Sequence, residues 1–414
     1  DMALFVNGLA VATLELKNPW TGQNVQNAVR QYRTDRDPKE PLFEFGRCLV
    51  HFAVDPDEAF MCAQLAGNDS NFLPFNKGFN YGKGNPVNPN GHKTAYLWQD
   101  ILPRRSLTNI IEQFAKFTVE KDKKTGKERK ALFFPRYHQL DVVRGILADA
   151  QQKGVGQTYL IQHSAGSGKS NSITWLAYQL VEQYDTTGTA NLFDSVVVVT
   201  DRRVLDTQLK DNIKLFSETK NIVAHCESAQ ELKYNLELGK KIIITTVQKF
   251  PFILDELGDL GSKKFALLID EAHSSQGGKT TAKMHMALSG SAAGAADDDE
   301  DGAQPSVEDA INQLIESRKM LPNASYFAFT ATPKNRTLEL FGERCVEGGE
   351  VTFRSPEELT YTTKQAIQEG FILDVMANYT PVDSFYHVAK TVQDDPDFDK
   401  TRALKKIRHY VESH

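Results

Sequence analysis

Two kinds of apolar pattern follow one another along this chain. Near its start, apolar and polar residues alternate over Met2–Val6 and Leu9–Lys17, on either side of Asn7-Gly8. Alternation with a period of two is typical of half-buried strands, and Asn-Gly between two such runs predicts a hairpin. Further along, runs of consecutive apolar residues replace the alternation. Such runs are typical of strands that are covered on both faces in a parallel sheet.

The buried runs predict the strands of a parallel sheet, and each of them ends in polar residues. They are Thr158–Gln162, Ser195–Thr200, Lys241–Thr246, Phe265–Asp270 and Ser325–Thr330. The carboxyl ends of parallel strands share one edge, where open α/β sheets bind ligands. The fold class is therefore α/β: a mixed-sheet domain, then a parallel-sheet domain with a ligand site along one edge.

Between the hairpin and the buried runs, the pattern predicts further strands and one helix. Arg47–Val54 and Glu58–Ala66 alternate and extend the first sheet, and Ser106–Val119 is predicted to be a helix. Asn68 to His92 is rich in Asn, Gly and Pro and is predicted to be an irregular loop. Its four aromatic residues either pin the loop to the domain or stack on DNA. The basic run Lys121–Lys130 is either a solvated hairpin tip or a DNA contact.

The hairpin register decides which charged residues share a face. Glu15 and Lys17 are two apart and lie on one face of their strand. A two-residue loop at Asn7-Gly8 would pair Asp1 with Leu14, on the opposite face. A three-residue loop with Gly8 as a bulge pairs Asp1 with Thr13, on the same face as Glu15. The bulged register also collects the apolar residues on one side, so we favour it.

Two carboxylates and a lysine on one face can perform metal-dependent phosphodiester chemistry. Asp1 and Glu15 are the candidate ligands of a divalent ion, Mg²⁺, and Lys17 is the candidate for positioning the attacking water. The ion lowers the pKa of that water and neutralises charge that develops on the phosphate. Asp1, Glu15 and Lys17 are therefore the candidate catalytic residues of a nuclease.

A second candidate site follows the first buried run. Gly166, Ser167, Gly168, Lys169 and Ser170 join that strand to a predicted helix, Lys169–Glu182. Glycines there let backbone amides close around phosphate oxygens at the helix N-terminus. Lys169 would reach the β- and γ-phosphates of ATP, and Ser170 would ligate Mg²⁺. His163 stands where the GxxxxGK[ST] pattern has its first glycine.

The order of the later motifs resembles the first RecA-like domain of superfamily 2 helicases over about residues 130–375. The resemblance implies that Asp270 holds Mg²⁺ through water and that Glu271 activates the hydrolytic water. It implies that His273 couples the site to DNA. Gln139, in Arg136-Tyr137-His138-Gln139, is similar to the glutamine that reads adenine in that superfamily.

The hairpin and its surroundings resemble the nuclease domain of the motor subunit of type I restriction-modification enzymes. The stretches that carry this resemblance are Leu14-Glu15-Leu16-Lys17-Asn18 and QNAVRQYRTDRD, from Gln26 to Asp37. Further along the chain, RYHQLDVVRG, DEAHSSQ and EGFILDVMANYT are similar to the same motor subunit. That family has a PD-(D/E)xK core and a Gln-x-x-x-Tyr element on the next helix. Tyr32 matches the tyrosine, but Ala28 occupies the glutamine position. Gln31 and Gln26 are the candidate substitutes.

The resemblance also implies a domain plan and partners. Residues 1–105 would be a PD-(D/E)xK nuclease domain lacking its beginning, residues 106–380 the first RecA-like motor domain, and residues 381–414 the start of a truncated second one. Such a fragment is expected to bind nucleotide but to hydrolyse it poorly. In the family, the subunit translocates double-stranded DNA and cleaves it, together with modification (methyltransferase) and specificity subunits.

Composition adds few constraints. The formal net charge is −6, which neither indicates nor excludes contact with nucleic acid, because phosphate contacts depend on local basic surfaces. No apolar run is long enough to span a membrane. The four scattered cysteines show no metal spacing and predict a reduced, cytoplasmic protein. Residues 289–305 are small and acidic, and are either a mobile loop or a DNA-mimicking or regulatory flap.

Two other functions remain open at this stage. One is a superfamily 2 helicase or repair translocase whose nuclease-like domain is inactive. The intact Asp1, Glu15 and Lys17 argue against it, and the half-matched Gln-x-x-x-Tyr element argues for it. The other is a non-enzymatic, nucleotide-gated DNA clamp. Glu271 argues against the clamp, because a clamp has no need of a catalytic base.

Overall fold

The computed structural model describes residues 1–121, 128–200, 222–270, 320–347 and 350–374. The chain forms two compact units, Asp1–Glu369 and Gly370–His414, and the described residues lie almost entirely in the first. No described helix has both the length and the apolar character that crossing a membrane requires. All four cysteines are free thiols.

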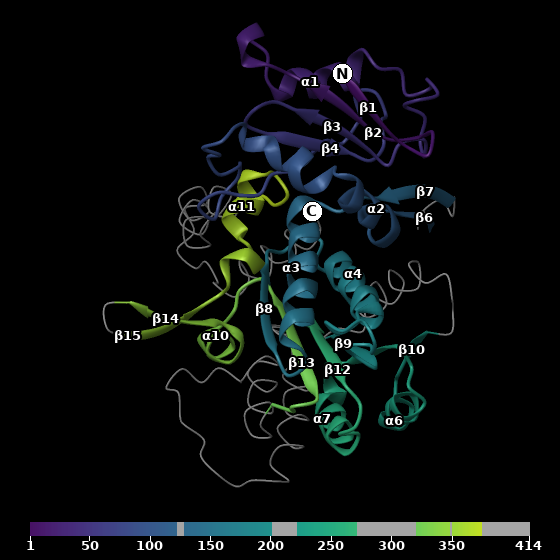
Figure 1. Ribbon diagram of the computed structural model, residues 1–414, viewed down its shortest axis with the longest axis vertical. Coiled ribbons are helices and arrows are strands. Elements are labelled where there is room, and N and C mark those ends of the chain that lie inside the picture. Colours follow the sequence, from purple (N-terminus) through teal and green to yellow (C-terminus); the bar gives the residue numbers. More distant parts are fainter. Residues whose placement is uncertain (122–127, 201–221, 271–319, 348–349, 375–414) are drawn as a thin grey trace, which may run out of the picture. The chain divides into compact units, whose positions relative to one another are not determined.

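The first sheet is mixed, with the order β1-β2-β3-β4-β5 (Figure 1). Only β2 and β3 are parallel neighbours, and helix α1 forms the crossover that parallel pairing requires. Residues 68–92 are almost wholly irregular, as the sequence predicts. The elements are β1 (Met2–Val6), β2 (Leu9–Leu16), α1 (Val25–Thr34), β3 (Val50–Val54), β4 (Ala59–Cys62) and β5 (Leu73–Pro74), with 3-10 turns η1 (Pro19–Thr21) and η2 (Lys93–Ala95) and a π-helical turn, η3 (Leu97–Ile101).

The first hairpin corrects the predicted loop. Val6 pairs with Leu9, so the loop has two residues, and both Asn7 and Gly8 have positive φ. This is the turn that Asn-Gly favours, and the prediction of a Gly8 bulge was wrong. The bulge lies in β2 instead: Phe5 pairs with Ala10 and Leu4 with Ala12, which leaves Val11 as the extra residue. The shifted register brings Ala3 opposite Thr13 and so returns Asp1 to the face of Glu15.

The second sheet is wholly parallel, with the order β10-β11-β9-β12-β13-β8-β16. All five predicted strands are present, which confirms the α/β architecture with a RecA-like parallel sheet. The two strands that the sequence pattern missed are the short β10 and β16. The strands are β8 (Thr158–His163), β9 (Ser195–Thr200), β10 (Val223–His225), β11 (Ile242–Thr246), β12 (Phe265–Asp270), β13 (Ala324–Thr330) and β16 (Thr360–Tyr361).

Helices cover both faces of this sheet. Alternate residues of the central strands pack either with α3 and α4 or with α6, α7 and α10, which accounts for the unbroken apolar runs. Figure 1 shows α3 and α4 side by side on one face. The elements are α3 (Tyr137–Lys153), α4 (Lys169–Glu182), α6 (Ala229–Glu237), η4 (Val247–Lys249), α7 (Phe250–Asp259), α10 (Asn335–Phe341), η5 (Glu357–Leu359), α11 (Thr363–Gln368) and a hairpin, β14 (Glu343–Glu347) with β15 (Glu350–Arg354).

The connection between the sheets differs from its prediction. The helix predicted over Ser106–Val119 is shorter, α2 (Arg104–Gln113), and the chain then forms an antiparallel hairpin of β6 (Lys116–Lys121) and β7 (Glu128–Phe133). Phe117 and Val119 are exposed and Thr118 between them is buried, which is the alternation of a strand. The helix was predicted to continue because its apolar residues run on into this segment. The tip of this hairpin, 122–127, lies outside the described residues.

One apolar core joins the first sheet to helices α3 and α4. Its aromatic centre is Phe75, whose ring lies 5.2 Å from that of Phe52 on β3, 6.4 Å from Phe134 and 5.8 Å from Tyr137 on α3, centroid to centroid. Phe52 and Phe75 are completely buried. One apolar core therefore contains residues from both sides of the domain boundary predicted at residue 105. The boundary predicted at residue 380 lies outside the described residues.

Replacing Phe75 tests this shared core. Phe75→Ala is expected to lower the free energy of unfolding by about 3–5 kcal/mol, because it removes a buried ring and leaves a cavity. Phe79→Ala is the matched control, since that ring is 46% exposed and its loss should cost less than about 1 kcal/mol. Chemical denaturation of both variants measures the difference. Equal losses would show that the aromatic centre does not hold the two sheets together.

Candidate functional site

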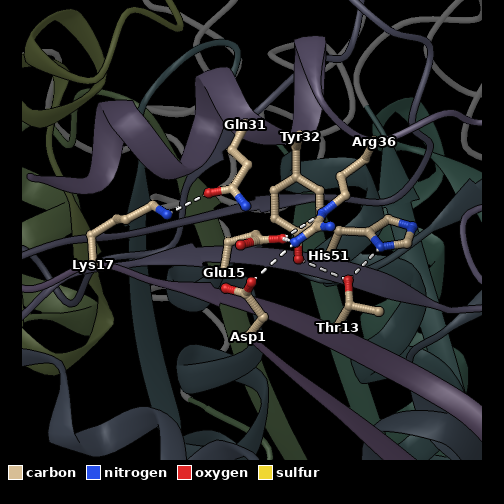
Figure 2. A network of polar contacts seen from close by, with 8 residues as sticks. All are labelled: Asp1, Thr13, Glu15, Lys17, Gln31, Tyr32, Arg36 and His51. Atoms are coloured by element: carbon tan, nitrogen blue, oxygen red, sulfur yellow. Dashed lines mark hydrogen bonds and ion pairs between the residues drawn. The ribbon is translucent and has the colours of Figure 1, made fainter.

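The face of the first sheet that packs against α1 carries the predicted nuclease residues (Figure 2). Thr13 and Glu15 alternate along β2 and are both buried, Glu15 to 3% exposure. Thr13 Oγ1 is 2.8 Å from the Tyr32 hydroxyl and 2.7 Å from His51 Nδ1, which ties β2 to α1 and β3. Burial raises the pKa of Tyr32 and lowers that of His51 to about 4. At neutral pH both side chains are therefore uncharged, so the Thr13 network on this face adds no charge to that of Glu15.

Asp1 and Glu15 converge, as the sequence predicts, and Arg36 contacts both. Arg36 Nε donates to Glu15 Oε1 over 2.7 Å, and Arg36 Nη2 donates to the same oxygen and to Asp1 Oδ2, the latter over 3.1 Å. Figure 2 shows these contacts as dashed lines from the guanidinium to both carboxylates. The sequence reasoning missed Arg36. The signal that pointed to it was a basic residue just beyond the end of the helix that follows the Glu-x-Lys strand.

Lys17 lies beside Gln31 rather than between the carboxylates. Its ammonium donates to the Gln31 side-chain oxygen (Figure 2). Of the glutamines considered for the Gln-x-x-x-Tyr element, Gln31 is therefore the one at the site, whereas Gln26 is exposed and Ala28 is buried in the core beneath α1. Tyr32 belongs to the Thr13 network. The roles of Asp1, Glu15 and Lys17 in catalysis stay predictions.

The residues present fit a divalent metal ion. Among the described residues, Glu15 Oε2 is buried and has no hydrogen-bond partner, so one oxygen of this carboxylate is available to a ligand. No group of three or more His, Cys, Asp and Glu in the described ranges is arranged around one point. A site with two carboxylates suits Mg²⁺, which keeps several of its waters and takes one or two protein carboxylates.

The phosphate loop between β8 and α4 is held by the start of α3. Arg136 Nη2 donates to the Gly166 carbonyl over 3.1 Å, and His138 Nε2 lies 3.1 Å from the Ser167 carbonyl. Gln139 Nε2 lies 3.1 Å from the carbonyls of both Ser167 and Gly168. Burial lowers the pKa of His138, so the ring is neutral and its Nε2 carries the hydrogen. Three side chains of one helical turn thus hold three successive carbonyls.

This capture orients the loop for phosphate. In a trans peptide the carbonyl and the next N–H point in opposite directions. Carbonyls of Ser167 and Gly168 that face α3 therefore turn the N–H groups of Gly168 and Lys169 away from it, at the N-terminus of α4. Gly168 has φ +80°, and a Cβ there would lie 2.4 Å from Gln139 Nε2. Ser167 Oγ is buried without a partner among the described residues. These features fit a bound nucleotide phosphate.

Lys169 and Asp270 meet at the carboxyl edge of the second sheet. Burial lowers the pKa of Lys169 to about 8, and the Asp270 carboxylate opposes that shift. Lys169 Nζ donates to the His163 carbonyl over 3.2 Å, at the end of β8. Ser170 lies in the first turn of α4. Glu271, His273 and the acidic stretch 289–305 lie outside the described residues, so their predicted roles stay predictions.

A cavity of about 370 Å³ opens beside Gln139. Its lining comes from the first sheet and its loop, including Cys62, Gln64 and Asn71, and from the motor side, including Arg136 and Gln139. The Gln139 amide faces the phosphate loop in this structure, and its oxygen accepts from Arg136 N. Adenine reading by Gln139 stays a prediction.

A support behind the phosphate loop was missed at the sequence level. Tyr361 on β16 stacks on His138, with ring centroids 3.9 Å apart, and its hydroxyl donates to Glu369 over 2.6 Å. Gln365 on α11 donates to the other oxygen of Glu369. The only sequence signal was the position of Glu369 in the EGFILD stretch, which carried no chemistry of its own.

Comparisons with known proteins show what this chain is similar to. Residues 1–70 match the family model described as "Type I restriction enzyme R protein N terminus", and residues 138–295 match "SWI2/SNF2 ATPase". Curated relatives include the type I restriction enzyme HindI endonuclease subunit of Haemophilus influenzae, 27% identical over 80% of this chain. Another is the putative MjaIXP endonuclease subunit of Methanocaldococcus jannaschii, 24% identical over 83%. The chain spans 29% and 30% of their lengths.

One similar solved structure is that of a nuclease-deletion mutant of the Type ISP restriction-modification enzyme LlaGI in complex with a DNA substrate mimic. The match has 12% sequence identity and a TM-score of 0.33, and it covers 63% of this chain and 23% of that one. The two family matches and the curated relatives show what the chain is similar to: an N-terminal segment like that of type I restriction enzyme R proteins, followed by a segment like the SWI2/SNF2 ATPases. This chain is an R-subunit-like protein, related to the endonuclease subunits of type I restriction enzymes.

The lowered pKa of Lys169 gives a test by pH. Above its pKa the Lys169 amine loses the charge that attracts phosphate. The affinity for ATP should therefore be highest below about pH 8 and should fall as the pH rises above that value. Between about pH 7 and 9 the dissociation constant is expected to rise about tenfold. Calorimetric titration with ATP measures it, with Lys169→Arg as the control that keeps its charge. A flat wild-type profile would show that Lys169 does not bind the phosphates.

Proposed function

We propose that this chain belongs to the restriction subunit of a cytoplasmic type I restriction-modification complex, in which ATP-driven translocation of duplex DNA is coupled to metal-dependent cleavage. The main support for this proposal is that two candidate sites, one for phosphate and one for a metal ion, occur in the same compact unit. One is the phosphate loop held by the start of α3, and the other is the converged pair Asp1 and Glu15.

In the motor, the chain's own groups bind and orient the nucleotide. The N–H groups at the start of α4 and the Lys169 ammonium would bind the phosphates, and Asp270 and Ser170 are the residues that would hold Mg²⁺. Glu271 would take up the proton of the attacking water. Bound Mg²⁺ would neutralise charge on the phosphates. Duplex DNA would then be moved by a cycle completed by a second RecA-like domain.

In the nuclease site, Asp1 and Glu15 would hold the divalent ion, which lowers the pKa of water and neutralises the phosphate. Lys17, placed by Gln31, would orient the water that attacks phosphorus. Recognition of the DNA site would be supplied by the modification and specificity subunits.

The alternative is a superfamily 2 translocase with an inactive nuclease-like domain. The Arg36 bridge between the two carboxylates is the observation in its favour, because it neutralises the acidic pair. The buried Glu15 Oε2 weighs against it, because an unpaired buried carboxylate oxygen costs stability unless it serves a ligand. A nucleotide-gated clamp leaves the acidic pair without any purpose.

Mutation should separate the two chemistries in the complete complex. Lys17→Ala is expected to abolish cleavage while DNA-dependent ATP hydrolysis and translocation persist, because Lys17 is placed on the nuclease face. Glu271→Gln is expected to lose all three activities, because cutting depends on the motor. Plasmid cleavage and phosphate release are measured in the same reactions.

Lys39→Ala is the matched control for Lys17→Ala, since Lys39 is an exposed lysine of the same domain. It should keep every activity. If Lys17→Ala still cut plasmid at the wild-type rate, the nuclease assignment would fail. If Glu271→Gln cut normally, the motor would not gate the nuclease.

A further inference from the structure

Arg36 bonds both carboxylates that a metal ion shared by Asp1 and Glu15 would use. Its Nη2 touches Asp1 Oδ2 and Glu15 Oε1 at once, and its Nε makes a second bond to Glu15 Oε1. We propose that Arg36 is a latch: it competes with the divalent ion for the two carboxylates, and it moves to a DNA phosphate when the ion and DNA bind. This inference rests on the proposed nuclease function.

Space and charge both require the exchange. Arg36 Nη2 donates to an oxygen of each carboxylate, so an ion that took both carboxylates as ligands would compete with it for those oxygens. The guanidinium neutralises one of the two negative charges, which reduces the attraction that the pair offers to a second cation. Glu15 Oε2, buried and without a partner in the described structure, is the oxygen that the ion would satisfy once Arg36 has moved.

Arg36 is placed where it can leave. It follows the end of α1, after the C-cap residue Asp35, in a stretch without regular structure. Its side chain is 27% exposed, whereas that of Glu15 is 3% exposed.

The released guanidinium has a natural destination. Its planar fork of donors matches phosphate oxygens as well as carboxylate oxygens, and it stays charged in either position. A phosphate beside the metal would receive the donors that the carboxylates give up. Metal and DNA would then bind cooperatively, since each favours the same position of Arg36. Without DNA, the latch keeps metal occupancy and stray cleavage low.

Metal binding can be measured without any cleavage assay. Mg²⁺ is titrated calorimetrically into the nucleotide-free chain, and Glu15→Ala identifies the heat that belongs to this site. Arg36→Ala is expected to bind Mg²⁺ about tenfold more tightly than the wild type, the scale of losing one close competing cation. Arg30→Ala is the control, because Arg30 is an exposed arginine on the same α1 helix, and it should change affinity by less than about twofold.

A second titration tests the destination. With a short duplex present, wild-type affinity for Mg²⁺ should rise, whereas Arg36→Ala and Arg36→Gln should gain less. Unchanged or weaker Mg²⁺ binding in both Arg36 variants, with a wild-type melting temperature, would overturn the latch and make Arg36 a support for the carboxylates. If neither the wild type nor the variants show heat that Glu15→Ala removes, the proposed nuclease site itself fails.

Discussion

The capture of the phosphate loop by the first turn of α3 is the interaction on which the motor half depends. Three side chains, Arg136, His138 and Gln139, hold three successive carbonyls of the loop. A loop that is rich in small residues has many conformations, and these bonds select one of them before nucleotide arrives. Preorganisation of this kind removes part of the entropic cost that phosphate binding would otherwise carry.

The same turn connects the loop to the rest of the unit. His138 stacks on Tyr361, which bonds Glu369, and α11 in turn contacts the irregular loop that follows β5. Lys83 N donates to Gln368 Oε1, and Thr362 Oγ1 donates to the Tyr81 carbonyl. Tyr137, between Arg136 and His138, packs on Phe75. Contiguous packing therefore runs from the first sheet to the phosphate loop, and it is a physical basis on which the two sites could be coupled.

The sequence pattern predicts the fold well for strands that are covered on both faces and long enough to form an unbroken apolar run. The strands of SVVVVT and FALLID and helix α4 have their predicted bounds, because an unbroken apolar run or a Gly-Lys-Ser start leaves few alternatives. β10 and β16 are too short to form a pattern, and β6 was read as helix because its apolar residues continue those of α2.

The sequence predicted residues of the candidate sites, but it did not predict which contacts these residues make. The placement of Asp1 on the same face as Glu15 was predicted, but from a bulge at Gly8, whereas the bulge is at Val11. Local sequence specifies the Asn-Gly turn, yet the position of a bulge depends on how both faces of β2 pack. The carbonyl contacts of Arg136 and His138 depend on tertiary approach, which no local spacing encodes.

The most direct test of a motor that drives a nuclease measures translocation and cleavage on one DNA molecule. A triplex-forming oligonucleotide is placed at increasing distances from the recognition site, and its displacement by the complete complex is followed together with cutting. If the motor drives the nuclease, displacement needs ATP, its delay grows with distance, and cutting follows it. Cutting that proceeds without ATP, or before any displacement, would contradict that coupling and leave two independent activities in one chain.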